Sequence, residues 1–437
     1  METNKRRRLF DWGQNLVILM LALSAVLLIS QSTLYEGFGI FSTAQKGQQH
    51  LTEQIKSQGE SSMSVEPVTL AVQNPQGRYG VQYDSKMTQQ LFEDKLGSLL
   101  REALSGVKEV IPARKDQWQA VLQGTGSWIY YDFSTSLPLD TLPLWLGGEP
   151  SDAPLKGAAS TFLLTNVEQT YRLYYYDKVT QAYSICTLAE GSGERFLASI
   201  RDIPQNGALF AFEDSKQFGA LNENAMILPQ LPIMPVYEVK NPIAMPDKAT
   251  LETIMRDLSF NPSAAKVFEP ADGTAIKEGT AATLRIFNNG TISFHGQESD
   301  PRFPVSQENV GAMIERAQEL LVTLMANRCG DARPYLASVE IKENGGALLS
   351  FEYHLNGAPV KVYSEGYAAQ FTIQNGFILD FTVHLRQYLP TEEKSLILPE
   401  RLAVANAKAM EKTGYNLRLA YLDTGEALHI TANWILE

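Results

Sequence analysis

The most hydrophobic stretch of the chain lies close to its N-terminus. Residues 16–29 read LVILMLALSAVLLI and carry one hydroxyl group among fourteen side chains. A membrane span needs about 20 mostly apolar residues, so a cleaved signal peptide, a buried helix and a span are alternative interpretations. Leu9, Phe10 and Trp12 extend the apolar stretch, and residues 30–36 lack an A-x-A cleavage site. These details favour an uncleaved anchor over residues 12–32, with Trp12 at the membrane interface.

A basic cluster, Lys5 to Arg8, precedes this stretch. The positive-inside rule therefore predicts cytoplasmic residues 1–11, a single span, and an extracytoplasmic location for residues 33–437. Within the span, Ala22, Ser24 and Ala25 are small, and small residues let membrane helices approach closely. We expect Ala22 and Ala25, three residues apart, to share a face that binds a partner helix. The alternative is an anchor that merely tolerates small residues.

Beyond the span, polarity divides the chain into a stalk and two globular regions. Residues 33–65 turn rich in Gln, Ser and Lys, a composition that buries too little apolar area to order itself. Globular patterning begins at residue 66. Five prolines between Leu228 and Pro246 favour an extended connector rather than a helix or central strand. We therefore predict an N-terminal domain over 66–235 and a C-terminal region over 236–437.

The N-terminal domain shows both helical and strand periodicity. Residues 86–104 place Phe92, Leu96, Leu99 and Ala103 on one helical stripe. Strands are predicted at 67–73, 127–133, 160–166, 169–177 and 181–188. The short separations among the later strands are typical of an antiparallel meander.

The alternation of apolar and polar residues is clearest in the C-terminal region. We predict a helix over 249–258, a hairpin over 284–294 turning at Asn289-Gly290, a helix over 306–327 capped by Ser306, a meander over 335–387, a helix over 399–412 and a hairpin over 415–435. Alternate residues such as Phe377, Leu379 and Phe381, or Leu428, Ile430, Ala432 and Trp434, are expected on the buried face. The predicted fold class is α+β: a single transmembrane helix, then mixed α/β extracytoplasmic domains with antiparallel sheets. The C-terminal sheet is expected to be covered on one side only.

Overall charge and cysteine content exclude two classes of protein. The formal net charge of −12 argues against nucleic-acid binding, which depends on basic residues that neutralise phosphates. Two cysteines, Cys186 and Cys329, cannot form a thiolate zinc site and allow at most one disulfide. No metal or other cofactor is predicted.

Three histidines, His354, His384 and His429, fall on the outward face of the predicted C-terminal sheet. A metal- or ligand-binding face is one interpretation, and a solvated polar face is the other. Catalytic zinc needs three converging ligands, whereas the nearest pairing here is His354 with Glu352. The pattern therefore favours the solvated face.

Other candidate chemistry is sparse. The sequence lacks a G-x-S-x-G elbow, an H-E-x-x-H helix and a Walker loop, so no catalytic residues are predicted. Glu298 and Asp300 could act as acid and base but lie in a polar loop. The tyrosines Tyr171, Tyr174, Tyr175 and Tyr176 could stack on sugars or divide between core and surface. Asn289 matches a glycosylation sequon, but a hairpin turn explains it.

Two segments carry a resemblance to a known family. Residues 118–147, WQAVLQGTGSWIYYDFSTSLPLDTLPLWLG, resemble the YycH family of membrane-anchored regulators of Gram-positive bacteria. Residues 419–437, LAYLDTGEALHITANWILE, are similar to the C-terminal hairpin shared by YycH and its sister family YycI. The anchor, the stalk and the mixed α/β outer part agree with the resemblance over most of the length.

The resemblance implies a regulator rather than an enzyme. Its partner would be a membrane sensor histidine kinase of a two-component system controlling cell-wall metabolism, and a YycI-like sister protein would be a further partner. Two other classes stay open: a wall-polymer or peptide-binding module, marked by an aromatic-lined groove, and a secreted hydrolase, marked by converging carboxylates or histidines.

Overall fold

The computed structural model describes residues 65–149, 155–167, 170–188, 195–244, 246–279, 282–297, 302–306, 309–342, 345–363, 365–409 and 414–436. All of them belong to one compact unit of the chain. No helix within these ranges is long and apolar enough to cross a membrane. The expected span, with Ala22, Ser24 and Ala25, lies outside the described residues, and so does the expected stalk over 33–65 except for Val65.

A sheet of seven strands, counted over the described ranges, organises the first half. Its strands are β1 (Thr69–Asn74), β2 (Gly77–Gln82), β3 (Val107–Ala113), β4 (Ser127–Pro138), β5 (Ala158–Val167), β6 (Thr170–Asp177) and β7 (Ala182–Leu188). They lie in the order β2-β1-β4-β5-β6-β7-β3, and every neighbouring pair is antiparallel. The predicted meander is thereby confirmed as β5, β6 and β7.

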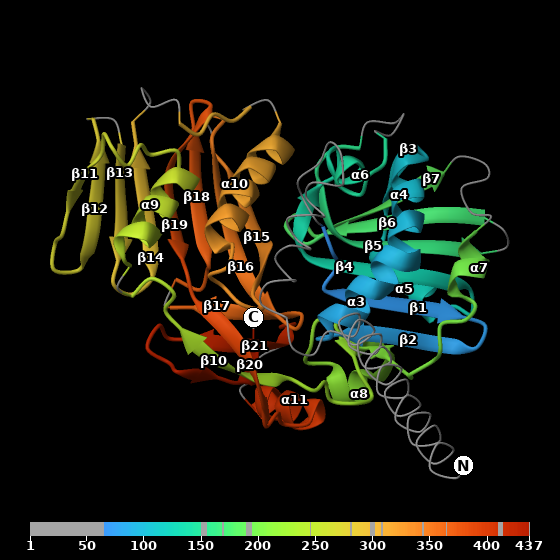
Figure 1. Cartoon of the computed structure of the whole chain (residues 1–437). Helices are drawn as coiled ribbons and strands as arrows, with labels where there is room; N and C mark the ends of the chain where they lie inside the picture. Colours follow the sequence, from blue (N-terminus) through green and yellow to red (C-terminus); the bar gives the residue numbers. More distant parts are fainter. Residues whose placement is uncertain are drawn as a thin grey trace, which may run out of the picture. The chain divides into compact units, whose positions relative to one another are not determined.

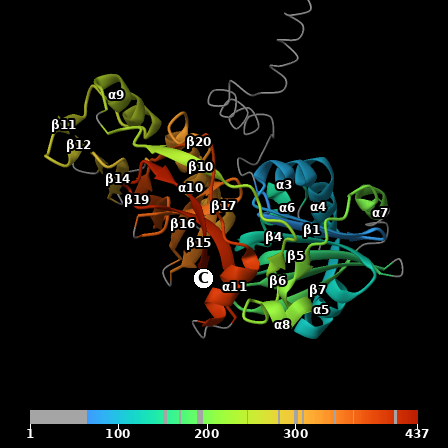
Figure 2. The same ribbon diagram turned by 90° about the horizontal axis from the view of Figure 1, so that it is seen from below.

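Helices cover both faces of this sheet (Figure 2). The predicted helix is present as α3 (Ser85–Leu91) and α4 (Gly97–Ser105), joined by a π-helical turn, η1 (Phe92–Leu96). Its buried residues pack with Ile129 and Tyr131 on one face. The opposite face packs against α5 (Lys115–Gln123), whose Trp118 is fully buried. Because both faces are covered, the sequences of these strands are nearly continuous runs of apolar residues.

Short elements connect this sheet to the second half. After β7 these are α7 (Phe196–Ile200), β8 (Leu209–Phe210), η2 (Ala211–Asp214), α8 (Ser215–Phe218) and β9 (Met226–Ile227), whereas α6 (Leu142–Trp145) lies between β4 and β5. The proline-rich segment then enters β10 (Pro235–Lys240), the middle strand of the order β20-β10-β22. The prediction that this segment contains no central strand is therefore wrong. Pro235 stands at the first position of β10, where a missing N–H is tolerated.

A larger sheet organises the second half, with eleven strands among the described residues. Its strands are β11 (Lys266–Phe268), β12 (Gly273–Glu278), β13 (Ala282–Phe287), β14 (Thr291–Gly296), β15 (Arg333–Ile341), β16 (Ala347–Leu355), β17 (Ala358–Val362), β18 (Ala369–Gln374), β19 (Phe377–His384), β21 (Leu417–Asp423) and β23 (Ala432–Leu436). The order is β11-β12-β13-β14-β19-β18-β16-β17-β21-β23, with β15 also beside β16. The predicted Asn-Gly hairpin is confirmed between β13 and β14, where Gly290 has a φ of 94°.

This sheet departs from the predicted simple meander at β17. That short strand was not predicted, and it runs parallel to β21. β17 and β18 both pair with the same edge of β16, and β15 pairs with the opposite edge. The C-terminal hairpin, predicted from alternation, is present as β21 and β23, which pair antiparallel.

Two helices, α9 (Lys248–Asp257) and α10 (Val310–Met325), lie against one face of the larger sheet (Figure 1). The apolar stripe predicted for α10 is confirmed, since Met313, Ile314, Ala317 and Leu321 are buried. Its N-cap is Asn309, not the predicted Ser306, and the Asn309 side chain accepts a hydrogen bond from the N–H of Gly311 at 2.7 Å. Asparagine and serine cap equally well, so sequence could not separate them.

Two alternation patterns are corrected by the structure. Ile378 is buried, whereas Phe377 and Leu379 are half-buried, because the pairing of β18 with β19 shifts by one residue at Thr372/Ile373. Such a bulge moves side chains to the opposite face. Leu428, expected inside, is exposed, because β22 (His429–Ile430) pairs with β10 and leaves the hairpin.

Hydrogen bonds join the two halves. The hydroxyl of Tyr83 accepts from the N–H of Leu419 at 3.0 Å, and Arg418 donates to the hydroxyl of Ser134 at 2.8 Å. The hydroxyl of Thr135 donates to the carbonyl of Ala337 at 2.9 Å. One buried apolar cluster contains residues of both sheets. The two halves therefore share a continuous core.

Candidate functional site

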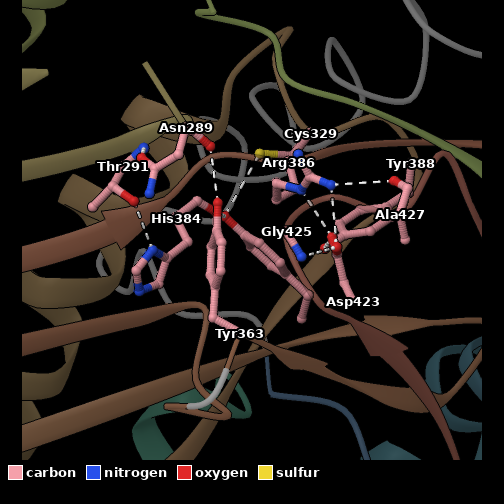
Figure 3. A network of polar contacts seen from close by, with 11 residues as sticks. Asn289, Thr291, Cys329, Tyr363, His384, Arg386, Tyr388, Asp423, Gly425 and Ala427 are labelled. Atoms are coloured by element: carbon pink, nitrogen blue, oxygen red, sulfur yellow. Dashed lines mark hydrogen bonds and ion pairs between the residues drawn. The ribbon is translucent and has the colours of Figure 1, made fainter. Parts of the chain in front are cut away.

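A buried ion pair lies at the corner between β19 and β20 (Gln387–Lys394), beside the end of β21 (Figure 3). Arg386 donates through Nε and Nη2 to the two carboxylate oxygens of Asp423, at 2.8 and 3.1 Å. Burial lowers the pKa of Arg386, but the hydrogen bonds and the charge of the Asp423 carboxylate outweigh this effect, so the net shift of the pKa is upward. The guanidinium of Arg386 therefore stays charged in the interior.

Neighbouring donors complete the coordination of Asp423. The hydroxyl of Tyr388 donates to Oδ2 at 2.9 Å, and the N–H of Gly425 donates to Oδ1 at 2.8 Å. Burial, followed by the nearby Asp423 charge, raises the pKa of Tyr388 well above its usual value, so the phenol keeps its proton. Both oxygens of the Asp423 carboxylate accept two hydrogen bonds each, so the network ties the C-terminal hairpin to the β19–β20 corner.

His384 is part of the same region rather than of a solvated face. Its Nδ1 shares a hydrogen bond of 3.0 Å with the hydroxyl of Thr291, and the ring of Tyr363 lies against it (Figure 3). The ring of Tyr367 also lies against His384. Its Nε2 has no hydrogen-bond partner among the described residues. Burial lowers its pKa, so the imidazole is neutral at pH 7.

His354 is buried as well, and the expectation of a solvated face is wrong for both residues. The ring of Tyr335 stacks on His354 with 4.1 Å between centroids, and burial lowers the histidine pKa well below its usual value. One strand of the sheet order, β18, separates the strand of His354 from that of His384, and His429 is exposed on β22 of another sheet. The three histidines do not converge on one point.

Metal and thiol chemistry find little support within the described ranges. No group of three or more potential metal ligands occurs there. Cys186 and Cys329 are both free and buried, and burial raises their thiol pKa to about 12 and about 11 respectively. They are therefore inert thiols rather than nucleophiles. Glu298 and Asp300 lie outside the described residues.

The tyrosine cluster of β6 divides between the two covered faces of the first sheet. Tyr174 packs with Trp118 on one face, and Tyr175 packs with Phe162 on the other. Tyr176 stacks on Tyr183 with 4.5 Å between ring centroids. The cluster thus contributes mainly to packing.

A groove of about 310 Å³ lies between α5 and the η2–α8 segment. Gln119 and Gln123 form its polar side, and Phe212 and Phe218 form its apolar side. Glu223 accepts hydrogen bonds from Gln119 at 2.6 Å and from Lys115 at 2.7 Å. Amide, carboxylate and aromatic groups around one hollow can hold a small polar ligand.

A second surface feature is an apolar patch, defined as Leu231, Ile233, Leu396, Leu398 and Leu402. These side chains are 41%, 65%, 96%, 51% and 54% exposed. Trp434 lies among them, and its indole N–H donates to the carbonyl of Leu398 at 2.8 Å. Leu402 belongs to α11 (Glu400–Ala409), which lies beside α8 in both views (Figures 1 and 2). Sequence analysis missed this patch, although the Leu396-Ile397-Leu398 run between charged segments was a visible signal.

Comparison with known proteins identifies the fold. The structure matches the crystal structure of YycH from Bacillus subtilis with a TM-score of 0.54. The match covers 85% of this chain and 93% of that chain at 12% sequence identity. No family model matches the sequence, and no curated protein is significantly similar to it. The fold of this chain is therefore YycH-like, as the sequence resemblance predicted.

Proposed function

We propose that this chain is a membrane-anchored, extracytoplasmic regulator of a two-component sensor histidine kinase that controls cell-wall metabolism. The observation that carries the proposal is the YycH-like fold, which extends over most of both chains. The basic cluster and apolar run near the N-terminus supply a predicted anchor, with residues 1–11 inside and residues 33–437 outside. The chain needs no catalytic centre or cofactor for this role.

Contact within the membrane is the proposed route of regulation. In a helix, Ala22 and Ala25 share one face, and small residues there permit close packing on a kinase helix. A YycI-like sister protein is a further candidate partner, because YycH and YycI normally act as a pair. The fully buried ion pair of Arg386 and Asp423 would keep the outer part rigid while the span makes these contacts.

Affinity purification of the detergent-solubilised full chain from its own membranes tests the proposal. A sensor kinase should co-purify with the unaltered chain, and Ala22→Leu with Ala25→Leu should abolish co-purification and change expression of the kinase's target genes. The matched control is Met20→Phe with Leu27→Phe, which adds bulk to the opposite helix face. Absence of any kinase from the unaltered chain's purification contradicts the function. Loss of the kinase from both double variants would point to bilayer insertion rather than the Ala22 face.

A second candidate, a wall-polymer-binding module, draws support from the groove at Phe212. Its aromatic ring, paired amides and carboxylate suit a sugar ring, whose hydroxyl groups need both donors and acceptors. Titration of the protein with N-acetylglucosamine oligomers, compared with the Phe212→Ala variant, distinguishes the two classes. Binding that depends on Phe212 would favour the wall-polymer-binding module, and the absence of binding would leave kinase regulation as the supported function.

A further inference from the structure

The apolar patch is an unusual feature for the surface of a chain with a net charge of −12. Three of its members, Ile233, Leu396 and Leu398, come from two segments that run together: Ser395 donates its N–H to the carbonyl of Met234 at 2.8 Å. Leu231 and Trp434 line one small crevice, which places the first segment beside the C-terminal strand. Contiguous exposed apolar groups of this kind mark interaction sites.

The backbone beneath the patch is fixed, so its side chains cannot fold inward. The hydroxyl of Ser395 donates to the carbonyl of Pro235 at 3.2 Å and accepts from the N–H of Ala432 at 2.9 Å. The interior below is already occupied, because Met234 is 1% exposed and belongs to the main core. The patch is therefore held outward by the fold.

We propose that this patch rests on the outer surface of the lipid bilayer, inserting Leu396, Ile233 and Leu402 at the boundary between headgroups and acyl chains. The inference rests on the proposed membrane anchor and goes beyond the proposed kinase contact. It assigns a membrane-facing side to the outer domain.

The size of the patch favours lipid over a protein partner. Stable protein interfaces bury about 1,200–2,000 Å² in total, which is much more than five side chains provide. Strand addition is also disfavoured, because the adjacent strand β20 carries Pro390, Glu392, Glu393 and Lys394. The acyl-chain boundary of a bilayer is fluid and apolar, so binding to it requires neither a complementary surface shape nor unpaired backbone groups.

The predicted tether makes a weak contact sufficient. The described chain begins at Val65, and the predicted span ends at residue 32, so 32 residues separate them. A polar linker of that length spans roughly 30 Å on average. Tethering at this range raises the effective concentration of the patch at the bilayer, where a few inserted leucines are enough for binding.

Charge neither drives nor opposes the contact locally. Lys394 and Arg401 flank the patch together with Glu393 and Glu400, so both signs are present. Trp434 lies among the residues of the patch, and tryptophan is a residue type enriched at the membrane interface. Insertion of apolar groups, rather than attraction to anionic lipid, is the driving force.

Fluorescence of the full chain in vesicles tests this placement. Leu396→Cys is labelled with the dye NBD, and the native cysteines do not compete because both are buried. The chain is reconstituted in phosphatidylcholine–phosphatidylglycerol vesicles that contain doxyl-labelled lipid. The matched control is Val179→Cys, which is 82% exposed in the turn between β6 and β7.

We expect a blue-shifted emission and several-fold stronger doxyl quenching at position 396 than at position 179. Leu402→Glu should remove most of the quenching at 396, whereas Leu197→Glu, an exposed leucine on α7, should not. Equal quenching at 396 and 179 would overturn the proposal. A blue shift without quenching would also overturn it, because protein rather than lipid would then cover the patch.

Retention of the chain in carbonate-washed vesicles separates this proposal from the one on which it rests. If the chain is retained and 396 is not quenched, the bilayer contact is wrong while the anchor and the kinase role stand. If the chain is washed away, the anchor is wrong and the bilayer contact falls with it.

Discussion

The guanidinium of Arg386 and the carboxylate of Asp423 form two parallel hydrogen bonds in the interior, 37 residues apart in sequence. Their side chains are 5% and 0% exposed. Because neither charge can reach water, each depends on the other, and removal of one partner leaves a buried charge uncompensated.

Asp423→Asn should therefore destabilise the protein by about 3–5 kcal/mol, since Arg386 would lose its counter-charge without any change in shape. Urea unfolding of the detergent-solubilised chain, followed by tryptophan fluorescence, measures the loss. The control is Asp380→Asn, which breaks the exposed pair with His295 and should cost less than about 1 kcal/mol. Equal losses in the two variants would contradict an essential role for the buried pair.

Glu400, the first residue of α11, should make stability depend on pH. Burial raises the pKa of its carboxyl to about 7, although the Leu228 N–H, which donates to it, acts in the opposite direction. The unfolded carboxyl loses its proton near its ordinary pKa, so between there and pH 7 the folded state binds more protons. The free energy of unfolding should therefore fall as pH rises through this window and level off above it.

The Glu400→Gln variant should lose this slope and be more stable than the unaltered chain at pH 8. One pKa unit corresponds to about 1.4 kcal/mol, and solvent screens a carboxyl that is partly exposed, so we expect a difference of about 1–2 kcal/mol. Glu393→Gln, at an exposed position of β20, is the control and should leave the pH profile unchanged. A profile for Glu400→Gln that parallels the original would exclude this carboxyl as its source.

Local periodicity was sufficient to predict most elements of the fold. The stripe of α10 and the meander β5–β7 follow directly from spacing, because side chains repeat every 3.6 residues in a helix and every second residue in a strand. The bulge at Thr372/Ile373 and the central strand β10 were missed for a common reason. Both depend on which distant strand pairs with the segment, and the residues of a segment do not by themselves identify that pairing partner.

The candidate sites show the same limit more strongly. His354 and His384 alternate with apolar residues, which correctly places them opposite the helix-covered face. Sequence could not show that Tyr335, Tyr363 and Tyr367 would then cover them. The apolar patch and the groove at Phe212 each combine segments far apart in the chain, so neither was predicted.

Gly311, at the start of α10, provides a test of how tightly the two halves are joined. A Cβ at this position would lie 2.4 Å from both Oγ1 and Cγ2 of Thr141, which belongs to the first half. Gly311→Ala should therefore destabilise the protein by about 1–3 kcal/mol through overpacking. The sign of the change in stability is informative, because helix propensity alone would make Gly311→Ala stabilising by up to about 1 kcal/mol.

Urea unfolding again provides the measurement, with Thr323→Ala on the exposed side of α10 as the control, expected to change stability by less than about 0.5 kcal/mol. Adding Thr141→Ala to Gly311→Ala removes both closest atoms and leaves only the Thr141 Cβ, 2.8 Å away. The double variant should regain part of the lost stability, since the two changes share one contact and are not additive. If Gly311→Ala stabilises the protein instead, α10 does not pack against Thr141 this closely in solution, and the junction between the two halves is looser than the one described.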